Sequence, residues 1–151
     1  MKIVLGGDHA GYPLKVKVAR QLEAWGHEVL DVGTNDAAPV DFPDITEALV
    51  ARLRDGSAER GLLVCGTGVG ASIAANKFRG VRAALCHDVH SAHQCVEHDD
   101  VNVMCIGAWI VGEKLAYDLI ATYLGATFST SEEFRRRVRK LGEIEAREAG
   151  G

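Results

Sequence analysis

The sequence comprises 151 residues, of which 47% are hydrophobic and 25% are charged, as in an ordinary globular domain with a sizeable core. Its formal net charge of −4 provides no basic excess for displacing counterions, so we expect no nucleic-acid partner. No apolar stretch reaches the roughly 18 residues of a membrane span and no secretory signal is recognisable, so we expect no membrane partner and a cytoplasmic location.

Short apolar runs alternate with segments of helical periodicity along residues 1–151, which we interpret as one domain. The runs predict five strands, at residues 2–6, 28–32, 61–65, 81–86 and 101–106. The first helix is predicted to begin near Pro13 and to end at Gly26, and the second to begin at Pro43. Apolar stripes of these helices and of a later one are Leu14, Val18, Leu22 and Trp25; Ile45, Leu49 and Leu53; and Ala116, Leu119, Ile120 and Tyr123.

Strands that alternate with helices favour an α/β fold with a doubly wound, five-stranded parallel sheet that is covered on both faces. We expect the Rossmann/flavodoxin-like strand order 2-1-3-4-5, in which the first and third strands are neighbours. Ligands of such sheets bind beyond the carboxyl ends of the strands, where the winding direction reverses. The loops at residues 6–11 and 65–70 are therefore expected to share one crevice.

A buried strand at residues 62–65 ends in Cys65 and leads into a glycine-rich turn at residues 66–70, called the glycine turn below. Bare N–H groups in this turn, and the positive end of the alanine-rich helix that follows, favour an anion. We therefore predict that the pKa of the Cys65 thiol lies below the ordinary value of about 8.5. The pattern indicates a base or nucleophile beside an anion site. Cys86 and Cys105 are interpreted as small core residues.

The last predicted helix begins with Thr130-Ser131-Glu132-Glu133, which has the spacing of a capping box. Its apolar stripe consists of Phe134, Val138, Leu141 and Ile144. Because no strand follows, this stripe packs either on the side of the domain or on another subunit, and we favour the second.

Four segments carry a resemblance to a known family: residues 7–11, residues 41–43, the glycine turn with Cys65 and Ala74-Ala75-Asn76-Lys77, and residues 98–103. They resemble type B ribose-5-phosphate isomerase, a family that also includes the galactose-6-phosphate isomerase subunits. The resemblance covers nearly the whole chain. It implies interconversion of aldose and ketose phosphates through an enediolate, without metal or other cofactor. It also implies homodimers or dimers of dimers with active sites between subunits.

Such an isomerisation needs one base and donors for a developing oxyanion, and the resemblance implies residues for both. Cys65 resembles the base, and Thr67 with the N–H groups of the glycine turn would hold the enediolate. Thr67 and Asp8 also suit a purely structural role in helix capping, and His9 suits a solvated loop. Substrate contacts are implied for Asp8, His9, Asp41, Gly66, Gly68, Val69, Gly70, Ser72, Asp99 and Arg137.

His98 resembles the histidine that opens the furanose ring by moving a proton, a task that suits a side chain whose ordinary pKa is near 6.5. In the family this histidine reaches the site across the subunit interface. Arg137 resembles a phosphate-binding arginine. The structural alternatives are a surface histidine at a helix end and a solvated basic face among residues 135–140.

Four positions depart from the family pattern and bear on the sugar. Phe42 stands where tyrosine is common, Asp99 replaces an asparagine, and Trp109 and Glu133 stand where arginines are common. Two bidentate phosphate donors are thus missing, unless Arg135 or Arg136 compensates. Trp109 would either shorten the pocket or pack in the interface. We expect ribose 5-phosphate as substrate, with a tetrose 4-phosphate or a hexose 6-phosphate as alternatives.

Two other classes of function compete with the isomerase. A nucleotide-binding module is indicated by Gly66, Gly68 and Ala71 with Asp88, but here the glycines follow the third strand instead of the first. A metal site is suggested by the crowded segment at residues 87–99, in which His90, His93 and Glu97 would share a helix face. A histidine-rich solvated helix explains that segment as well, and we predict no metal.

Overall fold

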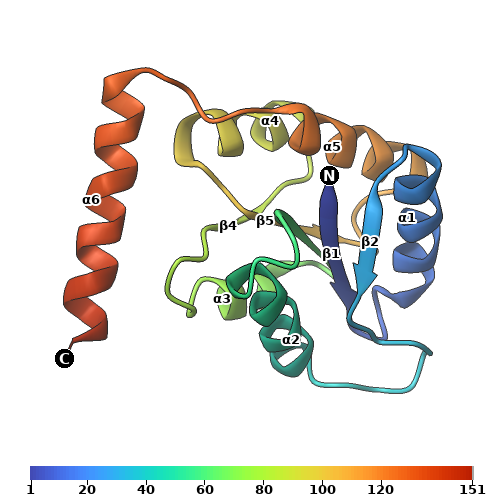
Figure 1. Cartoon of the computed structure of the whole chain (residues 1–151). Coiled ribbons are helices and arrows are strands. Elements are labelled where there is room, and N and C mark those ends of the chain that lie inside the picture. Colours follow the sequence, from blue (N-terminus) through green and yellow to red (C-terminus); the bar gives the residue numbers. More distant parts are fainter. Residues whose placement is uncertain (151) are drawn as a thin grey trace.

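Residues 1–150 are described by a computed structural model and form an alternating α/β fold (Figure 1). All strand pairs are parallel, as the alternation of elements predicts. The strands are β1 (Lys2–Gly7), β2 (Glu28–Asp31), β3 (Arg60–Cys65), β4 (Ala83–Leu85) and β5 (Val103–Gly107). The helices are α1 (Tyr12–Ala24), α2 (Phe42–Arg54), α3 (Val69–Ala75), α4 (Val89–Asp99), α5 (Glu113–Gly125) and α6 (Glu132–Ala149).

The sheet has the order β2-β1-β3-β5-β4, so the predicted order 2-1-3-4-5 is wrong in its last two strands. Burial explains the exchange. Every residue of β5 is buried, whereas in β4 Ala83 and Ala84 are only partly buried and Leu85 is exposed. The more apolar strand occupies the interior position and the short one forms an edge. As a consequence β5, and not β4, is the neighbour of β3.

Helices cover both faces of the sheet, which confirms the doubly wound fold. One core cluster joins the sheet to α1, α4 and α5, and a second joins it to α2 and α3 (Figure 1). Helix α5 buries its whole predicted stripe, and α1 buries Leu14, Val18 and Leu22 of its own, whereas Trp25 at the end of α1 is exposed. Cys86 and Cys105 are buried in these clusters, as predicted.

An ion pair between a buried lysine and a partly exposed aspartate fixes the chain between β2 and α2. The ammonium of Lys15, a side chain only 1% exposed, lies 2.5 and 2.6 Å from the two carboxylate oxygens of Asp31. Asp31 also accepts a hydrogen bond from the N–H of Gly33. A buried ammonium is tolerated only when it is paired in this way. The pair thereby anchors the loop that leads to Asp41.

Helix α6 stands away from the sheet and buries none of its residues (Figure 1). The predicted capping box does not form: Ser131 makes no side-chain cap, and Glu132 and Glu133 pair instead with Arg139 and Arg137. Exposed carboxylates at this helix start are within reach of arginines further along the helix. A groove of about 660 Å³ separates α6 from the body of the molecule, and its lining includes Lys77, Arg82, Leu141 and Ile144.

No helix among residues 1–150 combines the length and the apolar character of a membrane-spanning segment.

Candidate active site

The glycine turn leaves backbone donors free at the carboxyl end of β3. Gly68 adopts a left-handed conformation, with φ of 81°, and forms the N-cap of α3. Within residues 1–150 the N–H groups of Gly66, Thr67 and Gly68 donate to no protein acceptor. The Thr67 hydroxyl accepts from the N–H of Val69 at 3.3 Å, so its predicted structural role is present. The free donors form a site suited to an oxyanion or a phosphate.

Asp8 lies beside Cys65 because the loop after β1 packs directly on β3. A Cβ on Gly11 would lie 1.7 Å from the Val64 carbonyl oxygen, so only glycine permits this approach. The Asp8 carboxylate accepts a hydrogen bond from the N–H of Gly11 at 2.9 Å and faces the Cys65 thiol. The predicted convergence of the two loops is therefore confirmed.

The surroundings of the Cys65 thiol favour its protonated form. Burial raises its pKa to about 12, and the neighbouring Asp8 carboxylate raises it further in the same direction. The backbone N–H groups of Asp8 and Ala71 act in the opposite direction but do not compensate. The prediction of a lowered pKa is wrong because Cys65 is only 5% exposed, and desolvation outweighs the donors of the turn. Cys65 belongs to the core cluster that joins the sheet to α2 and α3, and the Asp8 carboxylate lies next to its sulfur.

Two aromatic rings lie against the glycine turn. A Cβ on Gly66 would lie 2.9 Å from the Trp109 ring, and one on Gly70 would lie 2.8 Å from the Phe42 ring. The Trp109 side chain is 73% exposed despite this contact. The backbone N–H of Trp109 donates to the Gly66 carbonyl at 2.9 Å, so the backbone is bound to the turn as well. Phe42 and Trp109, two of the positions that depart from the family pattern, thus border the turn.

His87 is a residue of this region for which the sequence suggested only a metal role. Its Nε2 accepts a hydrogen bond from the N–H of Gly107, at 2.9 Å, beside the turn. Within residues 1–150 no three His, Cys, Asp or Glu side chains are grouped so that they could hold a metal ion. His93 pairs with Glu97 at 3.2 Å. The sequence held no signal for the bond of His87, which depends on where β4 ends.

The loop before α2 meets the loop after β1. The Nδ1 atom of His9 accepts a hydrogen bond from the N–H of Val40 at 3.2 Å. Asp41 forms the N-cap of α2, is exposed and makes no side-chain cap bond. Its carboxylate is therefore free for a ligand. Ser72 lies in the first turn of α3, where its N–H donates to the Gly68 carbonyl.

His98, Asp99 and Arg137 lie together at a different place in the fold. The His98 ring stacks on Phe134 of α6, with ring centroids 3.9 Å apart and an interplanar angle of 13°. The Arg137 guanidinium lies 5.6 Å from the centroid of the same Phe134 ring and 3.4 Å from the Glu133 carboxylate. The end of α4 and the start of α6 therefore bring an imidazole and a guanidinium against one phenylalanine ring.

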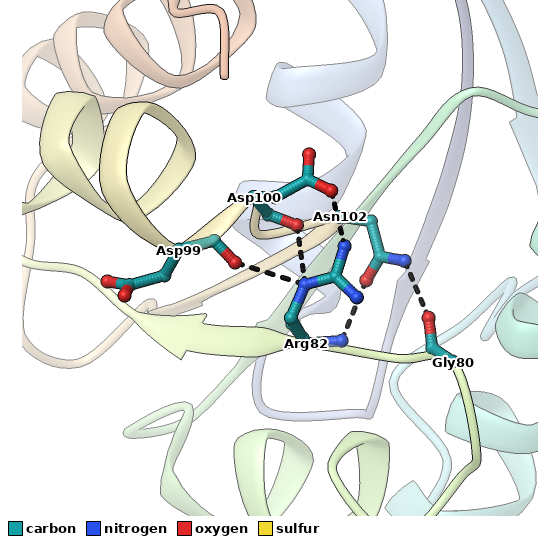
Figure 2. A network of polar contacts seen from close by, with 5 residues as sticks. All are labelled: Gly80, Arg82, Asp99, Asp100 and Asn102. Carbon is teal, nitrogen blue, oxygen red and sulfur yellow. Dashed lines mark hydrogen bonds and ion pairs between the residues drawn. The ribbon is translucent and has the colours of Figure 1, made fainter. Parts of the chain in front are cut away.

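A polar network holds the end of α4 in place (Figure 2). Arg82 donates to the backbone carbonyls of Asp99 and Asp100, at 3.0 and 2.9 Å, and to the Asp100 carboxylate at 2.7 Å. Asn102 accepts from the N–H of Arg82 and donates to the Gly80 carbonyl. The Asp99 carboxylate points away from Arg82 (Figure 2) and is not used by the network.

One chain does not bring His98 to Cys65. Cys65 pairs with Gly107 at the end of β5, whereas α4 leads into the start of β5, where Val103 pairs with Gly61. At about 3.3 Å per residue, the length of β5 separates the two levels by about 13 Å. His98, Asp99 and Arg137 therefore lie near the amino ends of the strands, whereas the glycine turn lies at their carboxyl ends.

The structure does not support Asp88 as the acidic residue of a nucleotide-binding motif. The Asp88 carboxylate accepts hydrogen bonds from the N–H and the hydroxyl of Ser91, both at 2.7 Å, and caps α4. An acid engaged in this way is not free to bind a ribose hydroxyl.

Comparisons with known proteins agree with the resemblance seen in the sequence. The Ribose/Galactose Isomerase family model matches residues 3–141. Ribose-5-phosphate isomerase B of Escherichia coli is 38% identical, with 97% of each chain covered. D-erythrulose-4-phosphate isomerase 2 of Mycolicibacterium smegmatis is 37% identical, with 93% of this chain and 95% of the relative covered. The structure of ribose-5-phosphate isomerase B of Clostridium thermocellum superposes with a TM-score of 0.94 at 43% identity, over 97% of this chain and 99% of that one.

Proposed function

This chain belongs to the Ribose/Galactose Isomerase family and is an aldose–ketose isomerase of sugar phosphates, and on that premise we propose that it converts ribose 5-phosphate to ribulose 5-phosphate with Cys65 as the base. The observation that carries this proposal is that the Cys65 thiol lies next to the Asp8 carboxylate, in the residue that directly precedes the free N–H groups of the glycine turn. A proton acceptor and donors for an oxyanion are what this reaction needs.

In the proposed reaction the Cys65 thiol gives its proton to the Asp8 carboxylate, and the thiolate takes the proton from C2 of the open-chain aldose. The electrons of that C–H bond form an enediolate, whose negative O1 accepts hydrogen bonds from Gly66, Thr67 and Gly68. The proton returns to C1 while the O2 hydroxyl proton passes to O1, which yields the ketose. Asp41 and Ser72 would bind sugar hydroxyls, and His9 the phosphate, beside Val69 and Gly70.

A tetrose 4-phosphate is the second candidate substrate, because the Trp109 ring covers Gly66 and narrows the space beside Cys65. The mycobacterial relative is named for a four-carbon substrate, which supports this alternative. A hexose 6-phosphate would need more room at the same place.

The experiment is a panel assay of ketose formation from four-, five- and six-carbon aldose phosphates. The highest kcat/KM with ribose 5-phosphate supports the proposal. A preference for the four-carbon substrate transfers it to tetrose phosphates. Absence of turnover with every member, together with binding of adenine or nicotinamide nucleotides, would replace it by the nucleotide-binding module.

We further propose that the enzyme acts as a homodimer or a dimer of dimers in which a second subunit supplies His98, Asp99 and Arg137. The separation of these residues from Cys65 within one chain supports this arrangement, as does the uncovered α6. Mixing Cys65→Ala and His98→Asn proteins after subunit exchange tests it. Mixed dimers contain one intact site, so activity should return. No recovery in verified mixed dimers would contradict a shared site.

We also propose a cytoplasmic location, because Cys65, Cys86, Cys95 and Cys105 are all free thiols, as is usual in a reducing compartment.

A further inference from the structure

We propose that His87 is a positioning residue of the active site, one that holds the segment at residues 107–109 against the glycine turn. The proposal rests on the isomerase function proposed above, since it concerns the same site. Its starting point is the hydrogen bond from the Gly107 N–H to His87 Nε2, at 2.9 Å.

The side chain of His87 stands where the sheet lacks a backbone acceptor. β4 pairs with β5 only up to Leu85 and Cys105. Continuing that register would place His87 level with Gly107, but β4 ends before it gets there. A longer strand would offer a carbonyl to the Gly107 N–H. The imidazole replaces it, so a buried donor of β5 remains satisfied.

Gly107 is in direct contact with the proposed catalytic groups. It pairs with Cys65 across the sheet, and a Cβ on it would lie 2.7 Å from the Thr67 backbone. The next two residues bind the turn as well: Ala108 donates to the Cys65 carbonyl at 2.8 Å and Trp109 to the Gly66 carbonyl at 2.9 Å. A shift of Gly107 would therefore displace both the oxyanion donors and the Trp109 ring.

The bond also defines which atom a replacement must supply. Because Nε2 accepts, this ring nitrogen carries no proton, and the proton of the neutral imidazole is on Nδ1. A glutamine side chain can place an amide oxygen close to the position of Nε2. An asparagine has the same amide group but is one bond shorter, so its oxygen ends nearer to the position of Nδ1.

The test compares His87→Gln with His87→Asn, and uses His90→Gln on the exposed side of α4 as the control. Two quantities are measured on the full-length protein: amide hydrogen exchange of Gly107, and kcat and KM with the aldose phosphate that the unmodified enzyme converts best. In His87→Asn, we expect exchange at Gly107 to be at least about tenfold faster. We expect kcat to fall about 10- to 100-fold in that variant, with a smaller change in KM.

His87→Gln should restore both quantities to within about threefold of the unmodified enzyme, and His90→Gln should leave them unchanged. Unchanged exchange and kcat in His87→Asn would overturn the proposal. So would a His87→Gln variant as impaired as His87→Asn, because the acceptor would then not be what matters. Exchange at Gly107 needs no substrate, so it decides the role of His87 even if every aldose phosphate fails and the proposed function falls.

Discussion

The indole ring of Trp109 lies on Gly66, the residue that follows Cys65, so closely that an added methyl group there would meet the ring at 2.9 Å. The ring is nevertheless 73% exposed, so one of its faces covers the turn while the rest borders solvent. Trp109 stands at the position where the family pattern has an arginine. If the proposed site is correct, Trp109 limits the room for the sugar and leaves its phosphate without a guanidinium at this position.

Trp109→Arg should improve the binding of ribose 5-phosphate. A guanidinium supplies a charge-assisted bidentate contact to phosphate that an indole does not supply. We expect KM for ribose 5-phosphate to fall about tenfold, equivalent to about 1.4 kcal/mol. Steady-state kinetics measures this. Trp25→Arg, at another partly exposed tryptophan at the end of α1, serves as the control and should leave KM unchanged. An unchanged or higher KM in Trp109→Arg would show that position 109 lies outside the phosphate site.

Cys65→Ala should abolish isomerisation and leave the fold intact. The loss of a proton-transferring group typically lowers the rate by about 10²- to 10⁴-fold. Coupled detection of ketose, with circular dichroism as the check on folding, measures both outcomes. Cys105→Ala is the matched control, because Cys105 is a fully buried thiol on the neighbouring strand. A folded Cys65→Ala protein with unchanged turnover would remove Cys65 from the mechanism.

His98→Asn should affect ribose 5-phosphate more than a tetrose 4-phosphate. Ribose 5-phosphate exists mainly as a furanose that must open, whereas an aldotetrose 4-phosphate cannot close this ring because its C4 oxygen carries the phosphate. We expect kcat/KM for the pentose to fall about 100-fold, with a much smaller loss for the tetrose. His90→Asn should change neither value. Equal losses for the two substrates would argue for phosphate binding by His98 instead of ring opening.

Alkaline pH should destabilise the protein partly through Cys65. Its pKa is about 12 in the folded chain, against an ordinary value of 9.0, so the unfolded chain loses this proton first as the pH rises. The contribution of the protonated thiol to stability is complete below about pH 9 and disappears between about pH 9 and 12. Urea unfolding midpoints across this range measure the loss.

Cys65→Ala should make the alkaline decrease less steep. Some decrease will remain, because burial also raises the pKa of Cys105 and of Tyr123. A decrease of the same steepness with and without Cys65 would mean that this thiol titrates normally in the folded chain.

Apolar periodicity was sufficient to predict the α/β fold and the approximate bounds of its elements. The exchange of β4 and β5 was not predicted, because the segments at residues 81–86 and 101–106 are both short apolar runs of the kind that predicts a strand. Only packing shows that all of Val103–Gly107 can be buried while Leu85 stays exposed. The capping box at Ser131 failed for a related reason, since arginines further along α6 bind the same glutamates.

The convergence of Asp8 with Cys65 was predictable, because neighbouring parallel strands end at one edge of the sheet. The direction of the Cys65 pKa shift was not, because it depends on how deeply the sulfur is buried. The role of His87 depends on the exact end of β4, which local sequence does not specify. The distance of His98 from Cys65 likewise follows from the path of the chain through β5.

Because β5 lies next to β3, residues 107–109 border Cys65, the proposed base, and supply no reacting group themselves. Residues 107–109 attach to the turn through backbone hydrogen bonds, so the side chain at position 109 is free to vary without disturbing that attachment. Under the proposed function, a different side chain at position 109 would alter the contact with the sugar phosphate and leave the backbone of the turn in place. The proposed base then follows from β3, whereas the proposed determinant of the sugar follows from β5.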